Sequence, residues 1–243
     1  MSEYSLKVAT VLNYFKKYPS IFNEREQRQI IGMINCSYKK PYEYDGIREI
    51  YDYFGWIPED ENIYNGFCEF LDSKFGLDGK NIVEVGGGHL PQLAKKISAK
   101  QKTGKITVYD SALSIYEKES PRFILKRERF SKNTNLKDTD LVIGLMPCGA
   151  TWDIISSATK NNADFAIALC EGGPHGDIYD FYEDEEEWIH SMIYGARQEV
   201  KNNDMGELIV EHSLTDYNDP YPVIYNKRKS VSYTHLRAHE TGR

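Results

Sequence analysis

Residues 81–91 read NIVEVGGGHLP, a short apolar run that ends in three glycines and is closed by a proline. A run rich in Ile and Val predicts a buried strand, and glycine lets the backbone turn sharply without a Cβ clash. Pro91 suits the first turn of a helix, where its missing N–H matters least. The segment therefore predicts a strand, a tight glycine turn and a helix that presents its N-terminal amides.

The same alternation of strand and helix continues toward the C-terminus. Six more β-rich runs lie at 105–109, 122–130, 140–146, 164–170, 207–214 and 221–227. Helices are predicted from near Leu90, Ala112 and Ala150, and a long one from Tyr179 to about Asn202. This order predicts βαβ units, which form a mainly parallel sheet with helices on both faces. The last two runs are joined by residues 215–220, too few for a crossover helix, so they should pair antiparallel.

The first 78 residues have a different pattern, because helical periodicity replaces the β-rich runs. Helices are predicted at Ser5–Lys17, after Ser20 or Asn23, at Asp45–Phe54 and at Glu59–Phe75. We therefore expect a helical N-terminal cap over residues 1–78 and a sheet domain over residues 79–230.

The last residues have no place in this pattern. Residues 231–241 read VSYTHLRAHET, which resembles a translated sequencing adaptor. We therefore assign no function to residues 231–243. The alternative, a genuine C-terminal tail, leads to the same functional interpretation.

Composition limits the classes of function. The net charge is -7, which disfavours a broad nucleic-acid-binding surface, since such surfaces need clustered Lys and Arg. The basic stretch Lys126–Lys132 holds four basic residues and one acid, and we expect a solvated strand edge there. No cysteine belongs to a CxxC pair, so neither a metal site nor a disulfide framework is predicted, and reduced thiols in a cytoplasmic protein are the simplest explanation. No apolar run reaches about 18 residues, so no membrane span is expected.

An acidic residue follows the second predicted strand. Asp110 lies 22 residues after Gly88, at the end of the run KITVYD. A carboxylate there can accept both ribose hydroxyl protons of a nucleoside, a device that NAD enzymes also use. A glycine turn alone is a weak signal, and an acid after a strand is often a helix cap. The two features together, at this spacing, favour a nucleoside cofactor.

The motif Glu84-x-Gly86-x-Gly88, Asp110 and the five parallel units with a final hairpin resemble the class I S-adenosylmethionine (SAM)-dependent methyltransferases, over residues 80–229. In that family the last strand inserts between two earlier ones, unlike in the ordinary dinucleotide-binding fold. The resemblance implies an α/β fold: a seven-stranded, mostly parallel Rossmann-like sheet with a C-terminal antiparallel hairpin and an N-terminal helical cap. It also implies SAM as the cofactor. The third glycine of the fuller motif is replaced here by Leu90.

The resemblance assigns roles to residues at several strand ends. Glu84 would order the turn or meet the ligand's amino group, and Phe130 would either pack on adenine or belong to the core. The fourth strand runs into MPCGATW, residues 146–152, at the position of the family's substrate-side motif, although the Asn-Pro-Pro-aromatic form is absent. The expected cofactor-binding residues are Glu84, Gly86, Gly87, Gly88, His89, Asp110, Phe130 and Met146.

The fifth strand runs into residues 170–177, CEGGPHGD, a loop rich in glycine around one histidine. His175 is the candidate general base, because its ordinary pKa lies near neutrality, and Glu171 is the candidate residue to orient the acceptor. The alternative for His175 is an exposed loop residue without a chemical role. We expect no metal site.

Three functions fit these patterns. The first is a SAM-dependent methyltransferase acting on a small molecule. The second is an NAD(P)-dependent oxidoreductase, which shares the glycine turn and Asp110; Pro91 and the two-strand ending argue against it. The third is a non-catalytic module with a methyltransferase fold that binds a nucleoside or a protein partner.

Overall fold

The computed structural model describes residues 61–88, 91–111, 113, 117–169, 185–212 and 222–227. Near the N-terminus it also describes seven single helical residues, which fall within the first two predicted helices: Leu12, Phe15, Lys16, Glu24, Gln27, Arg28 and Ile31. Several predictions lie outside the described residues: the helices at 45–54 and near Ala112, the connection 215–220, and the segment 231–243.

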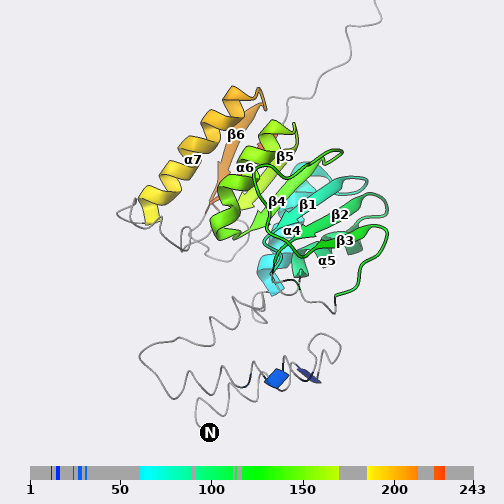
Figure 1. Ribbon diagram of the computed structural model, residues 1–243. Helices are drawn as coiled ribbons and strands as arrows, with labels where there is room; N and C mark the ends of the chain where they lie inside the picture. The colour runs from blue at the N-terminus through cyan, green and yellow to red at the C-terminus, as the bar shows by residue number, and fades with distance from the viewer. Residues whose placement is uncertain are drawn as a thin grey trace, which may run out of the picture.

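The described elements alternate between strand and helix (Figure 1). In chain order they are α4 (Glu61–Phe75), β1 (Asn81–Val85), α5 (Gln92–Lys100), β2 (Lys105–Tyr109), β3 (Phe123–Lys126), β4 (Leu141–Leu145), the 3-10 helix η1 (Cys148–Ala150), α6 (Thr151–Lys160), β5 (Asp164–Ala168), α7 (Glu185–Asn202), β6 (Glu207–Glu211) and β7 (Val223–Lys227).

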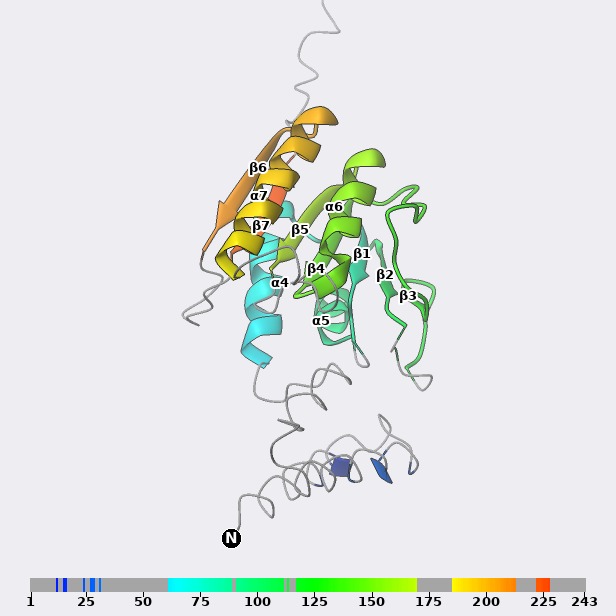
Figure 2. The ribbon, with the colours of Figure 1, turned by 60° about the vertical axis from the view of Figure 1, so that its left-hand side comes forward.

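One seven-stranded sheet organises the chain, in the order β3-β2-β1-β4-β5-β7-β6 (Figure 2). The first five strands pair in parallel, whereas β7 runs antiparallel to both β5 and β6. The predicted fold class, a mostly parallel Rossmann-like sheet with an antiparallel hairpin at its end, is confirmed. The last strand also inserts between two earlier ones, as the resemblance implied.

Strand lengths follow the partners that each strand has. β1 and β2 have the predicted bounds, but β3 covers four residues where nine were predicted. β3 is an edge strand with β2 as its strand partner, and the pairing ends where Tyr109 meets Lys126. Likewise β6 ends at Glu211, opposite Val223, the first residue of β7. The predicted strands at 122–130 and 207–214 are therefore longer than β3 and β6, because the pairing with the neighbouring strand ends first.

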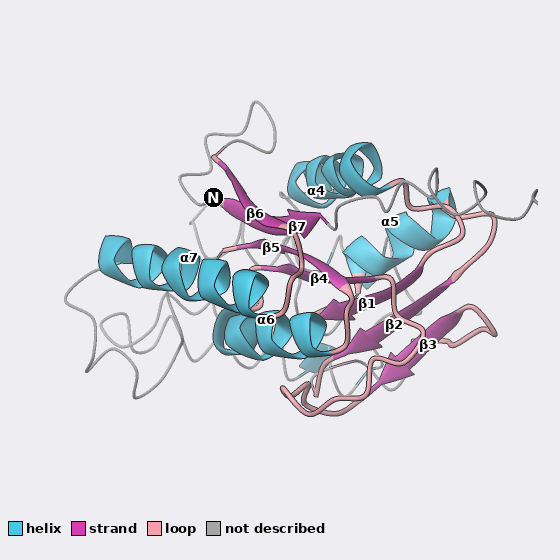
Figure 3. Cartoon of the chain, turned by 90° about the horizontal axis from the view of Figure 1, so that it is seen from above, coloured by secondary structure: helices cyan, strands magenta, loops and turns pink. Residues whose placement is uncertain are grey.

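Among the described helices, α4 and α5 lie on one face of the sheet, and α6 and α7 lie on the other (Figure 3). The alternation along each strand explains this arrangement, because successive side chains point to opposite faces. Ile82 belongs to the cluster under α4 and α5, while Val83 and Val85 belong to the cluster under α6 and α7.

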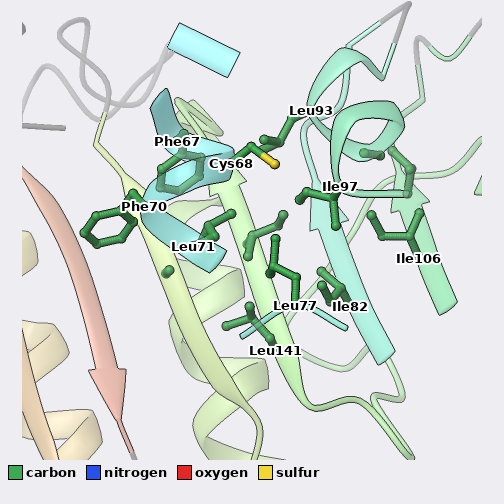
Figure 4. Packing of buried hydrophobic residues seen from close by; sticks show 14 of the residues in the cluster. Phe67, Cys68, Phe70, Leu71, Leu77, Ile82, Leu93, Ile97, Ile106 and Leu141 are labelled. Atoms are coloured by element: carbon green, nitrogen blue, oxygen red, sulfur yellow. The ribbon is translucent and has the colours of Figure 1, made fainter. Parts of the chain in front are cut away.

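Helix α4 is part of the layer that covers the sheet (Figure 4). Phe67 and Leu71 are fully buried in one cluster with Leu93 and Ile97 of α5. Burial of side chains of this size contributes about 1.5–3 kcal/mol each. This helix was expected to be the last one of the N-terminal cap, yet its apolar side is continuous with the core of the sheet. The domain boundary near residue 78 stays a prediction.

The C-terminal end of α4 is fastened to the hairpin. Lys74 Nζ lies 2.5 Å from Glu211 Oε1, and the Tyr225 hydroxyl donates to the same oxygen at 2.7 Å. The ammonium group also lies 5.7 Å from the centre of the Tyr225 ring. These contacts join the helix that precedes β1 to the last two strands of the sheet.

A buried amide fastens the hairpin at the opposite, amino-terminal edge of the parallel strands. Asn226 has no exposed surface, and its Oδ1 accepts from the Phe165 N–H of β5 at 2.8 Å. Its Nδ2 donates to the Met205 carbonyl at 3.2 Å. One side chain thus links β7 to β5 and to the turn before β6.

Replacement of Asn226 by alanine should therefore leave buried polar groups without partners. We expect Asn226→Ala to lower the free energy of unfolding by about 2–4 kcal/mol, measured by urea denaturation. Asn203→Ala is the matched control, because Asn203 is exposed, follows α7 directly and bonds to Glu199 of that helix. Equal losses in the two variants would contradict the anchoring role of Asn226.

Candidate functional site

The parallel register brings the carboxyl ends of several strands to one edge of the sheet. Val85 of β1 is opposite Tyr109 of β2, and Leu145 of β4 is opposite Ala168 of β5. The ladders continue one residue further, since Gly86 N–H donates to the Tyr109 carbonyl at 3.0 Å and Met146 N–H to the Ala168 carbonyl at 3.0 Å. The glycine turn, Asp110 and the segment after β4 therefore meet at this edge.

The three glycines of the turn are needed for two different reasons. Gly86 and Gly88 have φ angles of 79° and 65°, a region that other residues rarely adopt. Gly87 is sterically confined, because an added Cβ would lie 2.6 Å from Val108 Cγ1. The turn thus packs against Val108 of β2, and its three residues place backbone without side chains at the edge of the sheet.

Asp110 holds the glycine turn directly. Its Oδ2 accepts the Gly88 N–H at 2.9 Å, and its own N–H donates to the Lys126 carbonyl at 3.1 Å. The residue is half-buried. The acid after β2 and the turn after β1, 22 residues apart in sequence, therefore form one constellation.

Glu84 lies under the turn rather than on the surface. It is 3% exposed, and its Oε2 accepts the N–H of Ala94, the third residue of α5, at 3.1 Å. Pro91, the residue before the helix, makes no side-chain capping bond, so a carboxyl group from the adjacent strand takes that place. This bond orders the start of α5; the roles that the resemblance implied, ordering the glycine turn or contacting the ligand, stay predictions.

Burial changes the acid–base behaviour of Glu84. The pKa of Glu84 is raised to about 8, mainly because burial desolvates the carboxylate; the bond from the Ala94 N–H opposes the rise, and the negative charge of Asp110 adds to it. A buried carboxyl group that takes up its proton near neutral pH thus lies directly beneath the candidate site.

Phe130 and Met146, two of the expected cofactor-binding residues, differ in how deeply they are buried. Phe130 is 2% exposed and its ring meets Tyr109 edge to face at a centroid distance of 5.4 Å. The structure therefore places Phe130 in the core, which is the second of the two interpretations of this residue. Met146 is half-buried at the end of β4 and has a φ angle of 50°. His89, Glu171 and His175 lie outside the described residues.

The sequence placed Pro147 in a loop but gave no sign of its contacts. An added Cβ on Gly86 would lie 3.3 Å from Pro147 Cα, and one on Gly144 would lie 2.7 Å from Pro147 Cγ. The contact with Gly86 joins the turn after β1 to the segment after β4. A glycine inside a predicted central strand, three residues before a proline, was the available signal.

The chemistry of this edge suits a ligand that carries both hydroxyl groups and an anionic group. It combines backbone groups of a bare turn, a carboxylate and the first turn of α5. Among the described residues no group of three or more His, Cys, Asp or Glu is arranged to hold a metal ion. Nor does that part of the chain contain a helix with the length and apolarity that a bilayer crossing needs.

Comparison with known proteins gives similarity in structure alone. No protein-family model and no curated protein matches the chain. The magnesium protoporphyrin IX methyltransferase of Synechocystis PCC 6803 with bound SAM is 11% identical, with a TM-score of 0.46 over 70% of this chain and 80% of that chain. A putative SAM-dependent methyltransferase from Listeria monocytogenes is 12% identical, with a TM-score of 0.44 over 68% and 99%. The 23S rRNA methyltransferase ErmE is 11% identical, with a TM-score of 0.43 over 71% and 69%.

The raised pKa of Glu84 makes a prediction about stability. The folded chain holds this proton up to about pH 8, whereas the unfolded chain releases it near the ordinary value of 4.5. The stabilising contribution is therefore complete below pH 4.5 and is lost as the pH rises toward 8, by up to about 1.4 kcal/mol per pH unit. Glu84→Gln should flatten this part of the profile, because the amide stays neutral.

Urea denaturation between pH 5 and 8.5 measures this difference. Glu207→Gln, at an exposed position of β6, is the matched control and should keep the profile of the unmodified chain. Parallel profiles for Glu84→Gln and the unmodified chain would show that Glu84 titrates as an ordinary exposed acid.

Proposed function

We propose that the chain is a SAM-dependent methyltransferase that acts on a small-molecule acceptor. The observation that carries the proposal is the bond between the Gly88 amide and the Asp110 carboxylate, at 2.9 Å, on the carboxyl edge of a sheet ordered β3-β2-β1-β4-β5-β7-β6. In open α/β sheets, ligands bind beyond the carboxyl ends of the strands. The turn and the acid lie at that edge.

The residues present fit SAM in chemical terms. Asp110 would accept the ribose hydroxyls, since a carboxylate is an acceptor with two oxygens. Gly86 and Gly88 would allow close approach of the ligand to the backbone, and the amides at the start of α5 would face its carboxylate. Glu84 would hold α5 and the turn in place through its bond to Ala94.

When bound, SAM supplies a methyl group on a positively charged sulfur that is already activated. The protein then contributes mainly alignment of donor and acceptor, which in well-oriented systems is worth about 7–11 kcal/mol of the barrier. His175 as the base that removes the acceptor proton, and Glu171 as the residue that orients the acceptor, are part of the proposal.

A small acceptor is favoured over a nucleic acid by the charges near the site. The chain is acidic, and the basic stretch Lys126–Lys132 lies among acids. Arg127 donates to the carbonyl of Glu117, whose side chain pairs with Lys95 at 2.6 Å. Glu119 accepts the Leu125 N–H at 2.8 Å. Such an edge of mixed charge offers little attraction for a phosphate backbone.

The alternative of an NAD(P)-dependent oxidoreductase shares the glycine turn and Asp110. The strand order supports the methyltransferase instead, because the antiparallel β7 lies between β5 and β6.

Isothermal titration with SAM, S-adenosylhomocysteine and NAD separates the two functions, and we expect heat from the first two ligands alone. Binding of NAD and not of S-adenosylhomocysteine would reverse the assignment.

The role of Asp110 can be separated from its role in holding the turn. Asp110→Asn keeps one carbonyl oxygen for the Gly88 amide but removes the charge and the second acceptor oxygen. We expect binding of S-adenosylhomocysteine to weaken about ten- to hundredfold, with an unchanged melting temperature. Asp138→Asn, an exposed residue before β4, is the matched control and should bind normally. Unchanged affinity in Asp110→Asn would remove the ribose assignment.

A further inference from the structure

The contact between the glycine turn and the segment after β4 depends on one residue of a central strand. Gly144 lies in β4, between β1 and β5, on the face that α6 covers. An added Cβ would lie 2.7 Å from Pro147 Cγ and 2.9 Å from Ile154 Cδ1. Real side chains do not tolerate such distances, so the ring of Pro147 occupies the space that a larger residue at 144 would fill.

The backbone between these residues reverses sharply to bring Pro147 back over its own strand. Met146 reaches this geometry with a φ angle of 50°, while its N–H stays bonded to the Ala168 carbonyl of β5. The Pro147 carbonyl then accepts the Ala150 N–H at 3.0 Å, which closes η1 at the start of α6. Pro147 is thereby fixed on the β4 side by its neighbours in the chain.

The other side of Pro147 meets the glycine turn. An added Cβ on Gly86 would lie 3.3 Å from Pro147 Cα and 3.4 Å from Pro147 Cβ. Pro147 is buried, and its ring has little freedom to move aside. A displacement of the segment 146–150 is therefore passed on to Gly86, and through the turn to the Gly88 amide that bonds Asp110.

We propose that Pro147 is a positioning residue that locks the glycine turn to the segment 146–150, with Gly144 providing the space that lets it do so. The proposal rests on the proposed function, in which the turn holds the methyl donor and the segment after β4 borders the acceptor. The two borders of the site then move as one body. Alignment of donor and acceptor to a fraction of an ångström is what methyl transfer requires of the protein.

Substitution at Gly144 tests this lock in the whole 243-residue chain. Gly144→Ala should push Pro147 against Gly86, so that hydrogen exchange of the Gly86 and Gly88 amides becomes about tenfold faster or more. The affinity for S-adenosylhomocysteine should fall by a similar factor. Gly149→Ala is the matched control, since an added Cβ there meets nothing within 4 Å. It should leave the exchange of the Gly86 and Gly88 amides unchanged.

A second substitution identifies Pro147 as the residue through which Gly144 acts. In a Pro147→Ala background the ring is gone, so Gly144→Ala should cause little further change in the exchange of the Gly86 and Gly88 amides, although its contact with Ile154 Cδ1 of α6 remains and can still lower overall stability. Effects that add independently would overturn the proposal. So would equal behaviour of Gly144→Ala and Gly149→Ala, or faster exchange that extends equally to the amides of β7, which would indicate general destabilisation.

The two proposals can fail separately. If the unmodified chain does not bind S-adenosylhomocysteine, the proposed function fails, while hydrogen exchange at Gly86 and Gly88 still decides whether the lock exists. If Gly144→Ala does not fold, Pro147→Ala carries the test: exchange that quickens at the turn and not in β7 supports the lock, and unchanged exchange at the turn contradicts it.

Discussion

A hydrogen bond between the tips of two neighbouring strands is the contact on which the candidate site depends. The Gly88 amide and the Asp110 carboxylate belong to the ends of β1 and β2, and parallel pairing puts both ends on one edge. In an antiparallel pair these ends would point in opposite directions. The direction of the strands thus decides that a bare turn and an acid share one place. The proposed binding of a nucleoside needs both parts, whereas neither part is a site by itself.

The support beneath this contact is a buried carboxyl group, that of Glu84. Glu84 lies in the layer between β1 and α5 at 3% exposure. A buried ionised carboxylate is costly, so the group holds its proton to a higher pH and bonds the Ala94 amide. An apolar residue would pack there at lower cost but would leave the start of α5 without a cap. The site's geometry is thus maintained by a residue whose charge state depends on pH.

The sequence predicted the fold well, because its signals were local and repeated. Alternation of strand and helix, and a connection too short for a crossover, were enough to predict the sheet and its antiparallel end. The membership of α4 in the layer over the sheet was not predictable, since helical periodicity gives an apolar side but not its partner. The glycine turn and Asp110 were found from spacing. The contact between Pro147 and Gly86 could not be found from the sequence, because two loops that lie 61 residues apart leave no periodic pattern when they meet.

The two edges of the sheet differ in what they contain, and the candidate site lies at the carboxyl edge. The carboxyl edge holds features that cost stability: a glycine inside β4, a non-glycine residue with positive φ at Met146, and the buried acid Glu84. The amino edge holds bonds that stabilise, since Asn226 links β7 to β5 and Asp140 accepts the Asn81 N–H at 2.8 Å. The hydrogen bonds at the amino edge therefore offset part of the stability that these features of the carboxyl edge cost.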